Sequence, residues 1–493
     1  MSSSSRGASG SRSRQSPAEN RRWLKRRVPR GQLYKLSPGK PRPKRLGSVE
    51  LADRVRTVAR AWWSWLTVAI VLQERGHWRG ALVAAGIAFV FYHTSADTHP
   101  AVFPLASDLS VDSAEFRRTL EGVTGMPSVS GNRVTIYNNG DEFYPAMLDA
   151  VHSASRSITM EQYIYWDGVV GERFAEAFAK KARAGVPVKL LLDAIGSATL
   201  GAKIFRILEA GGCQVAWFHP IHWYTVHRAT QRDHRKSLIV DGRIAFTGGA
   251  GLGDHWLGTA ATATEWRDMQ VSIAGPAALA QQSSFAQNWL ATTGEILSGE
   301  QFFPKVERQG TIAVQTILSS PSDGAAAVGT MYLTALQCAR RELLIANPYF
   351  VPDSRVTAML AAARRRGVNI RLMLAGEHID AWWARQNSIR RYGKLLEAGV
   401  EIYEFEPTML HQKTMLVDGS WATIGTANFD NRSFALNEET SLCFHDRAVT
   451  RELLAIFEKD LKRCRQVSLK AWRRRGLWQR GKEAVASLIE DQI

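Results

Sequence analysis

Two short segments of the 493-residue chain carry the same reactive side chains at the same spacing. Each has the pattern His-x-Lys, followed after four residues by Asp-Gly. The copies comprise His234, Lys236 and Asp241, and His411, Lys413 and Asp418. On an extended strand, residues two apart face the same side, and Asp-Gly is typical of a hairpin turn. One copy could be only the polar edge of a strand, but two equivalent copies indicate a reaction centre.

These side chains suit the transfer of a phosphoryl group. Two lysines can hold its anionic oxygens and stabilise the charge that develops in the transition state. A neutral histidine can attack phosphorus, while a protonated one donates to the departing oxygen. The segment "GTAN" after the second motif adds Thr426 and Asn428 at the same end of the hairpin. No cluster of carboxylates or cysteines suggests a metal, so we predict neither metal nor cofactor.

The elements that position these motifs occur twice. "RAGVPVKLLL" (183–192) recurs as "RRGVNIRLML" (365–374), and "LEAGGCQVAWFHP" (208–220) recurs as "LEAGVEIYEFEP" (396–407). The motif blocks, 234–251 and 411–428, share eight of 18 positions. A period of roughly 180 residues is too long for a solenoid. Because strands and helices alternate from residue 130, we predict two similar α/β sandwich domains, each a mixed sheet flanked by helices, related by a pseudo-twofold axis.

The two HxKxxxxD motifs, each followed by a glycine-containing segment, resemble the phospholipase D superfamily. Segments such as "EQYIYWD", "NPYFVPD" and "NFDNRSFALNEE" are similar to bacterial cardiolipin synthases in particular. The resemblance implies a covalent phosphatidyl-histidine, with His234 as nucleophile and His411 as general acid and later base. The residues alone leave the order of the two histidines open.

The resemblance implies further site residues. They are Lys236, Lys413, Asn428 and Thr426 at the phosphate, with Gly249 in the first copy; Glu439 and Glu161 orienting the histidines; and Asp241 and Asp418 orienting neighbouring side chains. The first copy departs from the superfamily, because Gly251 stands where an asparagine is usual. Either the phosphate is held asymmetrically, or Asp254 and nearby backbone amides compensate.

The positive charge is concentrated at the N-terminus. Residues 1–50 contribute +12 of the net +17, so the remaining chain is nearly balanced. We predict a disordered basic tail (1–47), an apolar Trp-rich membrane-associated segment (48–110), two phospholipase D-like domains (111–300 and 301–465) and a basic C-terminal helix (466–493). The scattered cysteines suit a reducing compartment, and no signal peptide is evident.

Two features favour a membrane surface. The apolar stretches 61–72 and 80–92 are each shorter than a bilayer span, so they form either a buried helix pair or a shallow tryptophan-anchored hairpin. Segment 461–482 has nine basic residues and no acid, which suits an interfacial helix or a solvated one. We predict a protein of the bacterial cytoplasmic membrane, peripheral or shallowly inserted, with cytoplasmic catalytic domains.

Several functions remain compatible with the motifs. The first is a phosphatidyltransferase that forms cardiolipin from phosphatidylglycerol or a related phospholipid on an anionic membrane. Water as acceptor would make the protein a phospholipase D instead. A nuclease would need positive charge beside the motifs rather than in the tails, so no nucleic-acid partner is expected. Both motifs are complete, which argues against a non-catalytic scaffold.

Overall fold

The computed structural model describes residues 62–94, 105, 108–220, 231–320 and 326–487. The basic tail predicted at 1–47 lies outside these residues. Within them, fifteen strands form one mixed sheet. The strands are β1 (Ser128–Asn138), β2 (Ile158–Gln162), β3 (Val188–Asp193), β4 (Gln214–Phe218), β5 (Lys236–Val240), β6 (Ile244–Gly248), β7 (Met269–Ala274), β8 (Ile312–Ser319), β9 (Glu342–Asn347), β10 (Asn369–Ala375), β11 (Glu401–Phe405), β12 (Thr414–Val417), β13 (Trp421–Gly425), β14 (Glu439–Phe444) and β15 (Cys464–Val467).

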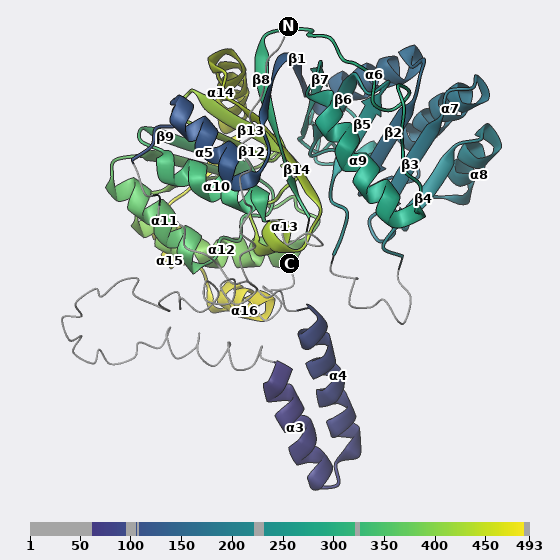
Figure 1. The fold of residues 1–493 in the computed structure, drawn as a ribbon. Coiled ribbons are helices and arrows are strands. Elements are labelled where there is room, and N and C mark those ends of the chain that lie inside the picture. Colours follow the sequence, from purple (N-terminus) through teal and green to yellow (C-terminus); the bar gives the residue numbers. More distant parts are fainter. Residues whose placement is uncertain (1–61, 95–104, 106–107, 221–230, 321–325, 488–493) are drawn as a thin grey trace, which may run out of the picture. The chain divides into compact units, whose positions relative to one another are not determined.

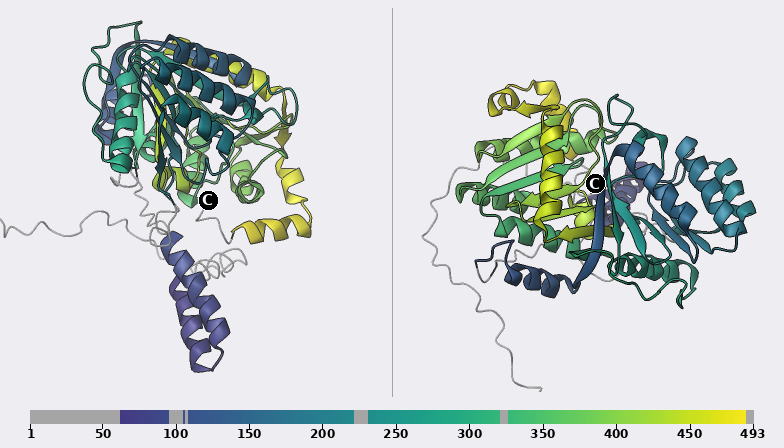
Figure 2. Two further views of the ribbon diagram at one scale, coloured as in Figure 1. Left: turned by 90° about the vertical axis from the view of Figure 1, so that its right-hand side faces the viewer. Right: turned by 90° about the horizontal axis from the view of Figure 1, so that it is seen from above.

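Helices cover both faces of this sheet (Figures 1 and 2). Those described are α3 (Trp62–Glu74), α4 (Trp78–Thr94), α5 (Ala114–Thr124), α6 (Asn139–Ser153), α7 (Val169–Arg183), α8 (Ala202–Gly211), α9 (Ala278–Thr293), α10 (Ala327–Cys338), α11 (Ser354–Arg365), α12 (Trp382–Glu397), α13 (Asn431–Ala435), α14 (Arg447–Leu461), α15 (Leu469–Arg473) and α16 (Leu477–Ala486). A short 3-10 turn spans Asp254–Trp256.

The strand order confirms the duplication. From its outer edge inwards the first half runs β4-β3-β2-β5-β6-β7-β1, and the second runs β11-β10-β9-β12-β13-β14-β8. The two halves join where β1 pairs with β8, and β15 is added outside β11. In each half three parallel strands are followed by antiparallel ones, beginning with the motif strand. The predicted fold of two similar α/β domains, each with a mixed sheet flanked by helices, is therefore confirmed.

The motif hairpins also form as expected. β5 pairs antiparallel with β6, and β12 with β13. Asp241 and Gly242 have φ angles of 55° and 62°, and Asp418 and Gly419 have 53° and 66°. Positive φ at two successive residues defines the turn whose twist matches that of a hairpin, and Asp-Gly tolerates it.

The histidines themselves do not lie on regular strands. His234 precedes β5, and both His411 and Lys413 precede β12. Their backbones instead bond to the opposite half of the molecule. The His234 N–H donates to the Glu438 carbonyl at 3.0 Å, and the His411 N–H to the Arg267 carbonyl at 2.7 Å. These two backbone hydrogen bonds hold both motifs at the boundary between the halves.

The predicted domain boundaries differ from the packing at two places. Helix α5, assigned to the first domain, packs in the core of the second half, where the Phe116 and Trp421 rings meet edge to face at 6.2 Å. The C-terminal segment is not one helix, because β15 reaches Val467 before α15 and α16 begin. The Trp472 indole is packed on α12 and donates to the Ile389 carbonyl at 2.7 Å.

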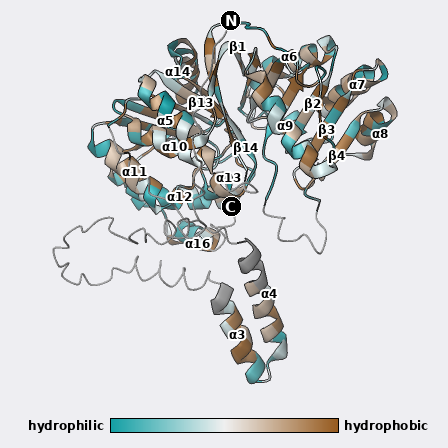
Figure 3. Cartoon of the chain, viewed as in Figure 1, coloured by the Kyte–Doolittle hydropathy of each residue, from teal (hydrophilic) through white to brown (hydrophobic). Residues whose placement is uncertain are grey.

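The apolar stretches near residues 61–92 form a pair of antiparallel helices, α3 and α4 (Figure 3). Their contact is made by small residues, because Ala69, Ala81, Ala84 and Ala88 are buried. Larger apolar side chains on both helices remain exposed, among them Ile70, Trp78, Leu82 and Val83. Among the described helices, none combines the length and the apolar character that crossing a bilayer would need.

Candidate active site

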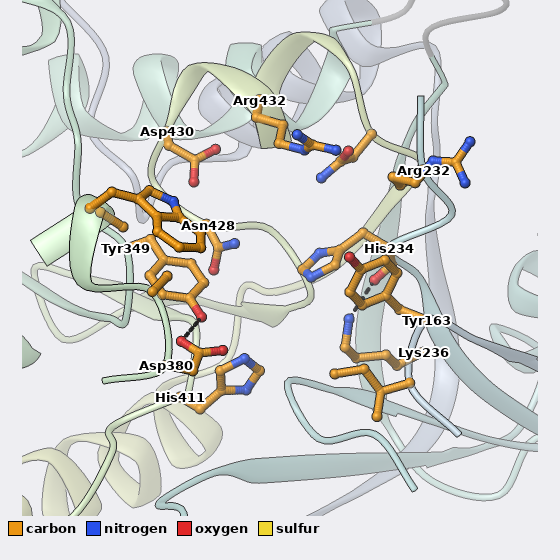
Figure 4. Close-up of a pocket in the computed structure, with 15 residues that line it drawn as sticks. Tyr163, Arg232, His234, Lys236, Tyr349, Asp380, His411, Asn428, Asp430 and Arg432 are labelled. Atoms are coloured by element: carbon orange, nitrogen blue, oxygen red, sulfur yellow. Dashed lines mark hydrogen bonds between the residues drawn. The ribbon is translucent and has the colours of Figure 1, made fainter. Parts of the chain in front are cut away.

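Both motif histidines line one cavity of about 530 Å³ at the boundary between the halves (Figure 4). Residues of the first half and of the second contribute to its wall. The lining residues are Tyr163, Ile164, Arg232, His234, Lys236, Tyr349, Asp380, Ala381, Trp383, Ala384, His411, Asn428, Asp430, Arg432 and Asn437. The expectation that the two histidines lie together thus agrees with the structure.

The His234 ring is fixed by a carboxylate of the other half. Its Nδ1 donates to Glu439, with distances of 3.0 and 3.1 Å to the two carboxylate oxygens. Glu439 also accepts bonds from the Thr426 hydroxyl and from the Asn437 amide. An ionised carboxylate only accepts, so Nδ1 carries the hydrogen and Nε2 keeps its lone pair. That is the tautomer a nucleophilic imidazole needs.

His411 is held in the same way by a carboxylate of the first half. Its Nδ1 donates to Asp268 at 2.7 Å. Asp268 in turn accepts bonds from the Trp256 indole (3.0 Å) and from the Met269 N–H (2.8 Å). Each half therefore supplies the carboxylate that orients the histidine of the other half.

Sequence reasoning identified Glu439 but missed Asp268. It proposed Glu161 instead, whose carboxylate accepts from the Asn288 amide at 2.6 Å and lies 3.9 Å from Arg235, with no contact to either histidine. Aligning the copies on the buried strand after each hairpin would have found Asp268. It directly precedes β7, and Glu439 begins the equivalent β14.

The two lysines are buried beside their own histidines. The Lys236 ammonium donates to the His234 carbonyl at 2.8 Å, and that of Lys413 to the His411 carbonyl at 2.6 Å. Lys413 Nζ also lies 3.1 Å from both ring nitrogens of His411. Burial lowers the pKa of Lys236 to about 7, helped by the charge of Lys413, and burial lowers the pKa of Lys413 to about 8. An anionic ligand would favour the charged form of both.

Burial also sets the protonation of the histidines. It lowers the pKa of His234 to about 4, against the opposing effect of Glu439. The pKa of His411 is lowered by burial and by the charge of Lys413. Burial alone would raise the pKa of Glu439 and Asp268, but their bonds to the histidines hold both below the usual range. At neutral pH the unliganded site therefore has neutral imidazoles on ionised carboxylates.

The motif aspartates lie away from the cavity, at the far ends of the motif strands. The Asp241 carboxylate accepts from the backbone N–H groups of residues 155–157, at 2.7 to 3.1 Å. Asp418 accepts from those of residues 340–342, at 2.7 to 3.0 Å. Both aspartates were expected to orient neighbouring side chains, and Asp241 does accept from the Ser155 hydroxyl at 2.9 Å. Their main contacts, however, secure the backbone that leads into β2 and β9.

Thr426 and Gly249, which were expected at the phosphate, lie instead beside the carboxylates that orient the histidines. Thr426 donates its hydroxyl to Glu439. A Cβ at the equivalent Gly249 would come within 2.2 Å of Asp268 Oδ1, so glycine leaves room for that carboxylate. Asn428 does line the cavity, and its backbone N–H donates to Ser433 Oγ at 3.1 Å.

The departure at Gly251 has a steric cause. A Cβ there would lie 2.8 Å from Cβ of Ile164, which occupies the cavity wall. Asp254 does not compensate for the absent asparagine. Its carboxylate accepts from the N–H groups of Val169 and Val170 and caps the start of α7. The structure therefore argues against the alternative in which the Asp254 carboxylate compensates.

Sequence reasoning also missed several polar residues of the wall. Arg232 lies two residues before the first motif, and Asp430, Arg432 and Asn437 fall inside "NFDNRSFALNEE". Burial raises the pKa of the Asp430 carboxyl to about 6. Their proximity to the quoted motifs was the available signal, but only the fold shows which of them face the cavity.

The matches to known proteins include both halves of the molecule. The fold and the paired His-x-Lys motifs define a two-domain phospholipase D-like protein. The family model described as "Cardiolipin synthase, PLD-like domain" matches residues 147–287 and 332–461. Cardiolipin synthase 1 of Bacillus anthracis is 31% identical over 390 residues, which cover 77% of this chain and 76% of that protein. The chain belongs to the cardiolipin synthase family of phospholipase D-like proteins.

Two further matches agree. A cardiolipin synthase of Staphylococcus aureus is 31% identical over 363 residues, 73% of each chain. The crystal structure of phosphatidylserine synthase from Haemophilus influenzae matches with a TM-score of 0.58 at 13% identity, covering 76% of this chain and 96% of that one. This last likeness supports the fold alone. Family and fold together support a phosphatidyltransferase activity for the chain.

Proposed function

We propose that the protein transfers the phosphatidyl group of one phosphatidylglycerol to a hydroxyl of a second, forming cardiolipin and glycerol through a phosphatidyl-histidine. The observation that carries this proposal is the arrangement of two imidazoles in one cavity, each tied through Nδ1 to a carboxylate of the opposite half. One ring can then act as nucleophile and the other as acid and base.

In the first step, Nε2 of His234 attacks phosphorus. The N–P bond forms as the bond from phosphorus to the glycerol oxygen breaks, and His411 gives its Nε2 proton to that oxygen. The low pKa of His234 keeps its lone pair available. Bound phosphate places negative charge near His411 and favours the protonated ring that this step requires.

In the second step, the headgroup hydroxyl of another phosphatidylglycerol replaces glycerol. His411, now neutral, removes the hydroxyl proton as the oxygen attacks phosphorus and the N–P bond breaks. Both histidines return to their starting states, so neither a nucleotide nor a redox partner enters the balance. Lys236 and Lys413 stabilise the phosphoryl oxygens in both transition states, and Asn428 adds an amide in the cavity wall.

We also propose that the protein works on an anionic lipid surface. Large apolar side chains are exposed beside the cavity, since Trp383 lines it and Trp382 precedes it at the start of α12. Helix α16 packs on α12 and exposes Leu477 and Trp478 by 84% and 79%. The exposed cations nearby are Arg473, Arg474, Arg480 and Lys482. Apolar and basic side chains in combination favour anionic lipid.

The catalytic proposal is tested by incubating the purified protein with phosphatidylglycerol vesicles and analysing lipid and water-soluble products. Cardiolipin and glycerol in equal amounts are expected, and His411→Ala should abolish both. Phosphatidic acid as the sole lipid product would replace the synthase by a hydrolase. A phosphatidyl-enzyme that accumulates in His411→Ala but not in His234→Ala would support the assigned order of the histidines.

The membrane proposal is tested by vesicle flotation. The double variant Leu477→Ser/Trp478→Ser should bind phosphatidylglycerol vesicles less than the unmodified protein does. Ile296→Ser removes an apolar side chain that is 73% exposed elsewhere on the surface and serves as the control. Equal flotation of the double variant and the control would contradict a role for α16.

A further inference from the structure

The cavity breaks the pseudo-twofold symmetry of the fold. Arg232 and Met409 occupy equivalent positions, each two residues before its motif histidine. Asn437 and Trp266 are likewise equivalent, each two residues before its orienting carboxylate. On the His234 side both side chains are polar and line the cavity. On the His411 side both equivalents are buried and apolar.

Aromatic rings close the His411 side. The Trp256 and Trp266 rings lie 5.6 and 5.4 Å from the His411 ring, and both tryptophans are buried. Neither is part of the cavity wall. The symmetry of the two motifs therefore does not extend to their surroundings, and polar space is available beside His234.

Two guanidinium groups mark that polar side. Arg232 is buried in the wall, where both terminal nitrogens of its guanidinium donate to the His219 carbonyl at 3.3 Å and one of them lies 3.6 Å from the Asp193 carboxylate. Arg432 comes from α13 in the other half and lines the same cavity above His234 (Figure 4). Burial lowers the pKa of Arg232, and the charge of Arg432 lowers it further, while Asp193 opposes both effects. An anion between the two cations would relieve their mutual repulsion.

We propose that Arg432 and Arg232 form a subsite for the phosphate of the acceptor, distinct from the reacting phosphate beside Lys236 and Lys413. This inference rests on the proposed function. Arginine suits phosphate because its planar fork can donate two parallel hydrogen bonds. The subsite makes an anionic glycerol derivative, rather than water or a neutral alcohol, the preferred acceptor.

The test compares acceptors that differ only in the phosphate. Phosphatidylglycerol vesicles are incubated with labelled glycerol or labelled glycerol 3-phosphate, and cardiolipin is measured in the same reactions. In Arg432→Gln, transfer to glycerol 3-phosphate and to phosphatidylglycerol should fall about tenfold or more, because a charge-assisted bond is lost. Transfer to glycerol should fall less than transfer to glycerol 3-phosphate, so that the ratio of the anionic to the neutral product decreases. Arg432→Lys should restore part of the preference for anionic acceptors.

The ratio of products is independent of the fraction of folded enzyme, so partial misfolding does not obscure the result. Arg206→Gln, an exposed arginine on α8, is the matched control and should keep the ratio of the unmodified protein. An equal loss with neutral and anionic acceptors in Arg432→Gln would overturn the subsite. Loss of cardiolipin alone, with glycerol 3-phosphate unaffected, would also overturn it, because the two acceptors share the phosphate. Failure of the unmodified protein to transfer to any acceptor would instead refute the proposed function.

Discussion

Replacing Glu439 by glutamine tests the orientation of the nucleophile directly. The two side chains have the same shape, but the amide has no charge and one of its terminal atoms is a donor. In the structure the carboxylate takes the His234 Nδ1 hydrogen at 3.0 and 3.1 Å, and it accepts from Thr426 and Asn437. All three partners are donors, so a glutamine must present its NH₂ group to one of them.

The expected loss follows from these contacts. Exchanging a charge-assisted hydrogen bond for a neutral one costs roughly 1 to 1.5 kcal/mol, which is about a five- to thirteenfold decrease in kcat. If the amide donates to Nδ1, the ring proton moves to Nε2 and the nucleophile is blocked. The loss then approaches about 10⁴, as for a wrong tautomer in a serine protease triad. We therefore expect a decrease in kcat of at least fivefold.

The assay is the initial rate of cardiolipin formation over a range of phosphatidylglycerol surface concentrations. Since Glu439 contacts His234 and not the substrate, KM should change little. Glu161→Gln is the control, because that carboxylate is equally buried but contacts neither histidine. A kcat within twofold of the unmodified protein for Glu439→Gln, with the same melting temperature, would contradict the orienting role of Glu439.

Three further predictions follow from the site and its supports. Because Lys236 and Lys413 have pKa values lowered to about 7 and 8, their charges are present below those values and lost above them, so kcat/KM should fall above about pH 7 to 8. Gly249→Ala should reduce kcat by displacing Asp268, as kinetics of the purified variant would show. Asp241→Ala should lower the free energy of unfolding by about 1 to 3 kcal/mol, measured by urea denaturation, because its backbone partners lose their acceptor.

Each of these three predictions has a control variant or an outcome that would contradict it. A pH profile that stays level to pH 9 would contradict the role of the lysine charges. Gly253→Ala adds a Cβ with ordinary contacts no closer than 3.4 Å, and it should retain the kcat that Gly249→Ala loses. Asp241→Asn keeps an acceptor and tolerates positive φ, so its stability should lie between the alanine variant and the unmodified protein. Equal stability of both variants would contradict the capping interpretation.

Much of the fold could be read from local patterns. The repeated blocks predicted two α/β halves, and the Asp-Gly pairs predicted hairpins whose φ angles the structure confirms. Both signals depend on residues that are close together in the sequence. Hydrophobic periodicity indicates which face of a helix or strand is buried, and the residue types in a turn indicate a few backbone angles. The His-x-Lys pairs were visible for the same reason, although only Lys236 lies on a regular strand and the other three residues precede β5 or β12.

The partners of those residues are long-range and were decided by packing. Glu439 is 205 residues from His234, and Asp268 is 143 residues from His411. Neither pair can therefore be recognised from a local sequence pattern. The role of Asp241 and the gathering of Arg232 with Arg432 likewise depend on which segments meet in space. The amino-acid sequence alone is enough to show two equivalent reactive motifs. That each half orients the histidine of the other follows from the tertiary fold, because the pairing of β1 with β8 joins the two half-sheets and the backbone of each motif histidine bonds to the opposite half.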